Sequence, residues 1–258
     1  MHATAEYLLN LRLSGSVVDE LPAELLPRDL AHGYQIQTEM TAALCAARGG
    51  TYSGYKVALT STTAQALVGY PAPVFGRMLE HSCHRGGVVL PADEFTTRIV
   101  ETEFAFQLAD DVPAGEYTQQ SIMPFVGDMF PSIELVDHRF AGLDRMNAAT
   151  LAADNAIHGG WVRGVNQANW RHIDLASHQV SLRVNGVETL AGAGNRVLEH
   201  PVAVLAWLAN ELPRHGLRLR AGDFVTTGLA TDGIYSALAG DELVADFGAL
   251  GQVLLDFS

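Results

Sequence analysis

The chain has 258 residues, of which 48% are hydrophobic and 17% are charged, a composition typical of a globular protein with a large buried core. Acidic residues outnumber basic ones by 29 to 16, giving a formal net charge of -13. Because nucleic-acid binding needs clustered basic side chains and no run of Lys or Arg is present, nucleic acid is excluded as an expected partner.

The N-terminal stretch does not resemble an export signal, because Glu6 and Arg12 interrupt its apolar residues. The longest apolar run, residues 202–209, is far shorter than the about 20 residues of a membrane-spanning helix. Cys45 and Cys83 lack the spacing of a metal or redox motif and are interpreted as reduced, buried small residues. We therefore expect a cytoplasmic protein without a membrane partner.

Helical periodicity covers residues 3–13 and 28–48, and Gly49 and Gly50 supply a stop signal after the second helix. The first 50 residues are therefore predicted to form an N-terminal helical arm, followed by one catalytic unit over residues 51–258. In that unit β-prone segments follow one another, with few helices between them. They are 55–60, 86–90, 98–108, 131–138, 179–190, 223–228, 242–248 and 251–258.

Two local signals refine this prediction. The Asn185-Gly186 pair between alternating segments indicates a two-residue hairpin, and Pro201 begins an apolar helix that ends before Gly216. Because regular helices do not separate the strands, a doubly wound parallel sheet is disfavoured. We predict an α/β (α+β) fold, strand-rich and of mixed strand direction.

Two glutamates lie close together within the segment RIVETEFAFQL, at positions 101 and 103. Alternate side chains of a strand point to opposite faces, so Glu101 and Glu103 share one face while apolar residues occupy the other. Glu134, in PSIELVDHR, is placed similarly among apolar neighbours. Three carboxylates on two strands suit a hard ion such as Mg²⁺ or Mn²⁺. The alternatives are a solvated strand face and pairing with Arg98, Arg139 or Lys56.

Seven motifs occur in one order along nearly the whole chain, namely GYKVALTS (54–61), PVFG (73–76), ETEFAFQL (101–108), PSIELVDHR (131–139), ADNA (153–156), GDFVTTG (222–228) and GDELVADFGALGQVLLDF (240–257). Together they closely resemble the 2-keto-4-pentenoate hydratase and 4-oxalocrotonate decarboxylase branch of the fumarylacetoacetate hydrolase superfamily. The resemblance implies a strand-rich β roll of that superfamily's C-terminal type. It also implies a homo-oligomer, and a complex with a neighbouring enzyme of the same pathway is a further expectation.

The resemblance assigns roles to individual residues. It implies that Glu101, Glu103 and Glu134 bind Mg²⁺ or Mn²⁺, and that Lys56, the single lysine of the chain, is the active-site lysine. A lysine there would hold a substrate carboxylate or stabilise an enolate, and burial near a metal would lower its pKa toward acid/base use. Further expected substrate contacts come from Ser61, Val74, Asn155 and Thr227.

The substrates implied by the resemblance are 2-oxo or 2-hydroxy acids with conjugated double bonds, formed when aromatic rings are cleaved and degraded. Hydration of a 2-hydroxy-2,4-dienoate is the leading expectation, and decarboxylation of a 4-oxalocrotonate-type diacid is the main alternative. Val74 stands where hydratases of the branch carry an acidic residue. His158 replaces a small hydroxyl residue and is either a substitute acid/base catalyst or a histidine that is hydrogen-bonded within the packing.

Two other functions stay open. Hydrolysis of an acylpyruvate C–C bond needs a general base, typically a histidine of the N-terminal segment, and HGYQIQTEM at 32–40 does not show that pattern clearly. A non-catalytic metal-binding partner subunit is the second, although the presence of Lys56 and all three glutamates argues against it.

Overall fold

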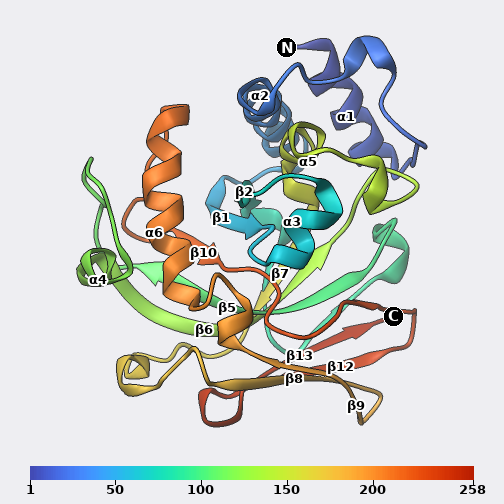
Figure 1. The fold of residues 1–258 in the computed structure, drawn as a ribbon. Coiled ribbons are helices and arrows are strands. Elements are labelled where there is room, and N and C mark those ends of the chain that lie inside the picture. Colours follow the sequence, from blue (N-terminus) through green and yellow to red (C-terminus); the bar gives the residue numbers. More distant parts are fainter.

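The computed structural model describes all 258 residues. Helices α1 (Ala3–Ser14) and α2 (Leu30–Arg48) come first, and the Asp29 side chain caps α2 by accepting a hydrogen bond from the His32 amide. Both helices lie near α5 (Ala148–Ala153) at one end of the molecule (Figure 1). Apolar residues of these three helices pack against the adjoining ends of the central sheet's strands and form a second, smaller hydrophobic core.

The central sheet has eight strands in the order β2-β1-β10-β5-β6-β7-β3, with β11 pairing β5. The bounds are β1 Tyr52–Ala58, β2 Val74–Leu79, β3 Cys83–Arg85, β5 Ile99–Leu108, β6 Val126–Val136, β7 His158–Arg163, β10 Phe224–Thr226 and β11 Tyr235–Ser236. Strands β2 and β7 contact each other although they are not neighbours in this order, so the sheet is strongly curled. The curl encloses one face of the sheet.

A second sheet has five strands in the order β4-β13-β12-β8-β9 and lies below the central sheet in Figure 1. Its bounds are β4 Val88–Leu90, β8 Gln179–Val184, β9 Val187–Ala193, β12 Glu242–Asp246 and β13 Gln252–Phe257. The predicted hairpin is confirmed, because Asn185 and Gly186 join β8 to β9 with φ of 51° and 81°. The larger core lies between this sheet, the outer face of the central sheet and helix α6 (Pro201–Glu211).

The strand-rich α/β fold is thus confirmed, including the helix that begins at Pro201. Strand β6 begins at Val126, five residues before the predicted start, and β2 and β7 were not predicted. Glycines at 76, 159 and 160 weaken the β-propensity of these two segments, and pairing with neighbouring strands overrides it. Short helices α3 (Thr62–Val68) and α4 (Gln119–Ile122) complete the fold. No helix combines the length and apolar character that a membrane crossing requires.

Candidate metal centre and active site

The enclosed face of the central sheet carries the predicted carboxylates. Glu101 lies directly opposite Glu134 in the β5–β6 register, and Glu103 lies opposite Ser132. One carboxylate oxygen from each of the three glutamates lies within 4.8 Å of the others. Glu103 and Glu134 are fully buried, whereas Glu101 is partly exposed and marks the side from which solvent reaches the cluster. The sequence prediction that these three side chains converge is therefore met by the geometry.

Hydrogen bonds fix the buried carboxylates. Glu103 Oε2 accepts from the Gly228 amide at 2.7 Å, and Glu134 Oε2 accepts from Thr226 Oγ1 at 3.2 Å. Gly228 adopts φ of 96°, and a Cβ atom there would lie 1.9 Å from Thr60 Oγ1, so only glycine fits. Glu103 Oε1 is buried and has no hydrogen-bond partner. A buried carboxylate oxygen without a partner is costly unless a cation satisfies it.

Lys56 lies on the same face of the sheet, because its register partner Thr226 in β10 also faces Glu134. Its Nζ is 2.8 Å from Glu134 Oε1 and only 1% of the residue is exposed. This contact occupies one of the three N–H donors of the ammonium group, so donors remain for another acceptor. Lys56 is thus placed with the three carboxylates, as the sequence predicts.

The charges in the cluster do not balance. Burial, reinforced by the negative charges of Glu134 and Glu101, raises the pKa of Glu103 well above its ordinary value. Burial also raises the pKa of Glu101. For Lys56, burial alone would lower the pKa, but the three carboxylates outweigh it and the pKa is raised. Without an ion in the cluster the lysine is therefore held as an ammonium ion, and the expected downward shift of its pKa beside a metal stays a prediction.

These residues fit a divalent cation. Three carboxylates meet a single ammonium ion, and Glu103 Oε1 is a buried acceptor without a donor. An all-oxygen set of this kind matches the preference of Mg²⁺ and Mn²⁺. A divalent ion would neutralise the two negative charges that Lys56 leaves unbalanced. The His81, Cys83 and His84 side chains do not take part in this cluster.

His158 contacts the cluster directly. Its Nδ1 is 3.1 Å from Glu134 Oε1, and its Nε2 is 3.2 Å from Ser82 Oγ. A carboxylate can only accept, so we assign the proton to Nδ1. Burial lowers the pKa of His158, so the ring is neutral. Because both nitrogens already have protein partners, the ring is better suited to orient Glu134 than to exchange protons with substrate.

The segment before His158 adopts an unusual backbone. Asn155, Ala156 and Ile157 have φ of 56°, 48° and 55°, a left-handed conformation that is particularly unfavourable for a β-branched residue. The turn packs against β2 so closely that a Cβ atom on Gly76 would lie 2.4 Å from the Asn155 carbonyl oxygen. The strained turn therefore sets the direction from which His158 reaches Glu134.

The N-terminal helix α1 holds this left-handed turn in place. Arg12 Nε donates to Asp154 Oδ1 at 2.7 Å, and its two terminal nitrogens donate to the carbonyl oxygens of Asp154 and His158. Asp154 is fully buried and Arg12 is 7% exposed. Arg12 therefore binds the residues on both sides of the turn. The predicted division into an arm over 1–50 and a catalytic unit over 51–258 stays a prediction. The hydrogen bonds of Arg12 join these two parts of the chain.

Val74 lies on the same face of the sheet as Lys56, because Val74 pairs with Ala58 and Gly76 pairs with Lys56 in the β1–β2 register. Its side chain is fully buried in the smaller core. A role in substrate contact stays a prediction. The position offers no group that could donate or accept a proton.

The other three predicted substrate contacts have protein partners already. Ser61 Oγ caps α3 by accepting from the Ala64 amide, and Thr227 Oγ1 donates to the Phe104 carbonyl. The Asn155 side chain accepts from the Arg77 amide at 2.6 Å and donates to the Arg77 carbonyl at 2.8 Å. The roles of these residues in substrate binding stay predictions, and the Asn155 amide is engaged in holding β2.

Sequence reasoning assigned no site role to Gly228, Ser82 or Arg12. The Gly228 amide could have been suspected from the glycine after Thr226 and Thr227, because glycine permits close backbone approach. Ser82 and Arg12 lie 76 and 146 residues away from His158 in sequence, and no local pattern links them to it.

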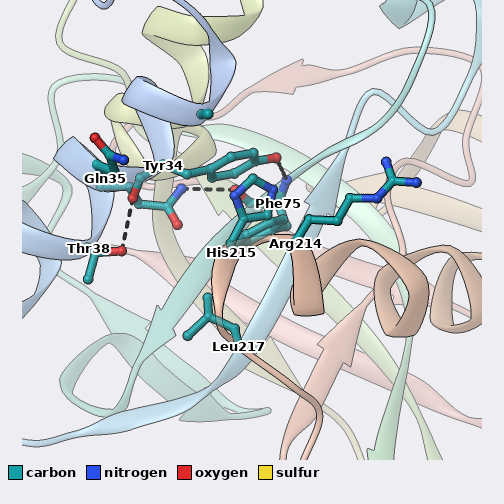
Figure 2. A pocket seen from close by; sticks show the side chains of 9 residues that line it. Tyr34, Gln35, Thr38, Phe75, Arg214, His215 and Leu217 are labelled. Atoms are coloured by element: carbon teal, nitrogen blue, oxygen red, sulfur yellow. Dashed lines mark hydrogen bonds between the residues drawn. The ribbon is translucent and has the colours of Figure 1, made fainter. Parts of the chain in front are cut away.

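Two cavities lie away from the carboxylates. One of about 240 Å³ lies between α2 and the segment after α6, beside Tyr34, Phe75 and His215 (Figure 2). The other, of about 410 Å³, is lined by residues that include Tyr55, Arg77 and Arg218. Neither is bordered by Lys56 or a cluster glutamate, so the candidate site is identified by its buried charged side chains and not by these two cavities.

No family model matches the chain. The chain is 31% identical over 230 residues to a 2-keto-4-pentenoate hydratase of Paraburkholderia phymatum, covering 89% of the chain and 87% of that protein. It is 28% identical over 258 residues to a 4-oxalocrotonate decarboxylase of Pseudomonas putida, covering 99% of the chain and 96% of that protein.

Among solved structures, the 4-oxalocrotonate decarboxylase from Pseudomonas putida G7, complexed with magnesium and adipate, superposes with a TM-score of 0.92 at 25% identity. The match covers 99% of this chain and 96% of that one. The chain belongs to the enzymes of the 2-keto-4-pentenoate hydratase and 4-oxalocrotonate decarboxylase branch of the fumarylacetoacetate hydrolase superfamily.

Proposed function

We propose that the protein is a divalent-metal-dependent lyase that adds water to 2-hydroxy-2,4-dienoate acids of the 2-keto-4-pentenoate type. The observation that carries the proposal is the buried cluster of Glu101, Glu103 and Glu134 with Lys56. Relatives named as hydratases support the reaction class. We also propose that the protein forms a homo-oligomer, associates with a neighbouring enzyme of its pathway and acts in the cytoplasm.

In the proposed site the three glutamates hold Mg²⁺ or Mn²⁺, which supplies Lewis acidity toward the oxygen atoms of the substrate. Lys56 binds the substrate carboxylate or 2-oxygen through its free ammonium donors and stabilises negative charge that develops there. Thr226 and His158 keep Glu134 oriented. Burial of Glu103, Glu134 and Lys56 shields them from bulk water and strengthens their electrostatic interactions.

Lys56→Met is expected to lower kcat/KM by a factor of about 10² to 10⁴, a range typical of a group that acts on the reacting atoms. Methionine keeps the length of the side chain and removes its charge. The metal-dependent rise in melting temperature should persist, because Lys56 contacts the substrate and not the ion. Steady-state kinetics and thermal melts with and without Mg²⁺ measure both. A rise in KM with unchanged kcat would confine Lys56 to ground-state binding.

His158→Leu tests whether the histidine orients Glu134 or exchanges protons with substrate. We expect metal affinity to fall about 10- to 100-fold, the range for residues that orient a metal ligand. Calorimetric titration with Mn²⁺ measures the affinity, and His172→Leu, an exposed histidine, is the control. Unchanged Mn²⁺ affinity with lost turnover would instead make His158 the acid/base catalyst.

Decarboxylation of a 4-oxalocrotonate-type diacid is the second candidate, and Val74 specifically favours it. Water addition needs a positioned proton donor, and a fully buried valine at this position provides none. Loss of CO₂ needs stabilisation of the enolate left behind, which then takes a proton, and no water has to be added to the substrate. The close superposition on a 4-oxalocrotonate decarboxylase gives this alternative further support.

The two reactions are distinguished by their products. Purified protein with Mg²⁺ is given a 2-hydroxydienoate and, separately, a 2-oxohexenedioate. Chromatography follows the 4-hydroxy-2-oxo acid, and a coupled assay follows CO₂. We expect hydration of the dienoate. CO₂ release alone would make the protein a decarboxylase, and Val74→Asp would then be expected to introduce some hydration.

A further inference from the structure

The cavity of about 410 Å³ is lined by Tyr55, Arg77, Gly216, Leu217, Arg218, Arg220 and Asp223, and we call it the arginine cavity. Tyr55 and Arg77 are register partners on the face of the sheet opposite to Lys56, so the arginine cavity and the carboxylate cluster lie on different faces. Three guanidinium groups here meet one lining carboxylate, in a chain whose net charge is -13. The smaller cavity of Figure 2 shares only Leu217 with it.

Arg77 is fixed as a cation without an acidic partner. Its guanidinium carbon lies 3.9 Å from the ring centroid of Tyr52 and 4.5 Å from that of Tyr55, and Nη1 donates to Tyr55 Oη at 2.8 Å. Its main-chain amide and carbonyl are both bonded to the Asn155 side chain. Arg77 forms no ion pair, and its Nε is buried without a hydrogen-bond partner.

The remaining charges leave the cavity positive. Arg218 is exposed and forms no ion pair, whereas Arg220 binds Asp111 at the rim, with 3.0 Å between Nη1 and Oδ2. Asp223 Oδ2 already accepts from the Arg220 amide. Even with Asp111 included, three guanidinium groups face two carboxylates, and Arg77 and Arg218 are the two without an acidic partner.

We propose that the arginine cavity binds a small oxyanion, a carboxylate or a phosphate, with Arg77 and Arg218 as its main ligands. The planar guanidinium group presents paired N–H donors whose spacing matches two oxygens of either anion. Stacking on Tyr52 and Tyr55 holds the Arg77 group in one orientation, so little side-chain entropy is lost when an anion binds.

Two segments of backbone link the arginine cavity to the carboxylate cluster. Tyr55 directly precedes Lys56 in β1. Asn155, which holds the Arg77 main chain, begins the left-handed turn that leads to His158. An anion on Arg77 therefore lies beside Tyr55, the neighbour of Lys56, and on a residue whose main chain is bonded to Asn155, while remaining separate from the carboxylates.

Isothermal titration calorimetry of the Mg²⁺-loaded full chain tests the proposal, with inorganic phosphate and succinate as separate probes at constant ionic strength. We compare the wild type with Arg218→Ala, Arg77→Lys and the control Arg183→Ala, a half-exposed arginine in the other sheet that pairs with Asp246. Wild type and control should bind at least one probe saturably. The affinity should fall about tenfold or more in the other two variants, as expected for the loss of a charged hydrogen bond.

The two probes separate the possible sources of the anion: phosphate binding alone identifies phosphate, and succinate binding identifies a carboxylate. Arg218 is exposed, so its removal tests the cavity even if Arg77→Lys disturbs the tyrosine stack. The proposal is overturned if the wild type binds neither probe. It is also overturned if all four proteins bind equally, because the anion then lies at the metal and Lys56.

Discussion

Glu103→Gln is expected to abolish turnover and to remove the Mg²⁺-dependent rise in melting temperature. Glutamine has the same shape, and its amide oxygen can still accept the Gly228 hydrogen bond, so the fold is retained. The charge at the unpartnered Oε1 position is lost, and a neutral amide is a much weaker ligand for a hard divalent ion. The loss of activity should therefore follow from loss of the ion and not from unfolding.

The size of the effect follows from binding linkage. An ion present at a hundredfold excess over its dissociation constant stabilises the native state by about 2.7 kcal/mol. For a chain of this size that corresponds to a rise of about 5–10 °C in melting temperature. Melts of chelator-treated protein, with and without added Mg²⁺, measure the rise in the wild type and its absence in the variant.

A comparison of the two metal-free proteins provides a second test, in which the variant should be no less stable than the wild type. Without an ion, Glu103 is repelled by Glu101 and Glu134, and Glu103→Gln removes that repulsion. The metal-free variant should therefore melt at or above the temperature of the metal-free wild type at neutral pH. Glu94→Gln, at an exposed position, is the control and should keep both activity and the Mg²⁺ response. A normal Mg²⁺ response in Glu103→Gln would remove Glu103 from the metal site.

The carboxylate cluster could be predicted from sequence because strand periodicity is a local property. The alternation around Glu101 and Glu103 determines their common face without knowledge of any other strand. Placing Glu134 opposite Glu101 requires the β5–β6 register, which residue spacing does not give; the resemblance to known enzymes implied only that the three glutamates share a metal ion.

The left-handed turn at 155–157 could not be predicted, because no glycine marks the positive φ at Ala156 or Ile157. Tertiary contacts impose this conformation: β2 approaches the turn at Gly76, and Arg12 binds the residues on both sides of it. For the same reason residue spacing could not decide between a catalytic and a packed ring at His158, whose partners Glu134 and Ser82 are distant in sequence.

Arg12→Met is expected to lower the free energy of unfolding by about 3–5 kcal/mol, the usual cost of removing one partner of a buried ion pair. The change leaves Asp154 fully buried, and its Oδ2 already lacks a hydrogen-bond partner. The carbonyl oxygens of Asp154 and His158 each lose a charged donor as well. The melting temperature should fall by about 6–20 °C.

The identity of the lost interaction is tested by a double-mutant cycle with Asp154→Asn. If the penalty comes from an uncompensated carboxylate, the double variant should be less destabilised than the sum of the single changes. Arg28→Met, an exposed arginine of the same N-terminal segment, should stay within about 0.5 kcal/mol of the wild type. Since Arg12 also binds the His158 carbonyl, Arg12→Met should weaken Mn²⁺ binding at temperatures where it remains folded. Wild-type stability in Arg12→Met would show that the helical arm does not support the site, and the left-handed turn would then have to be held by β2 alone.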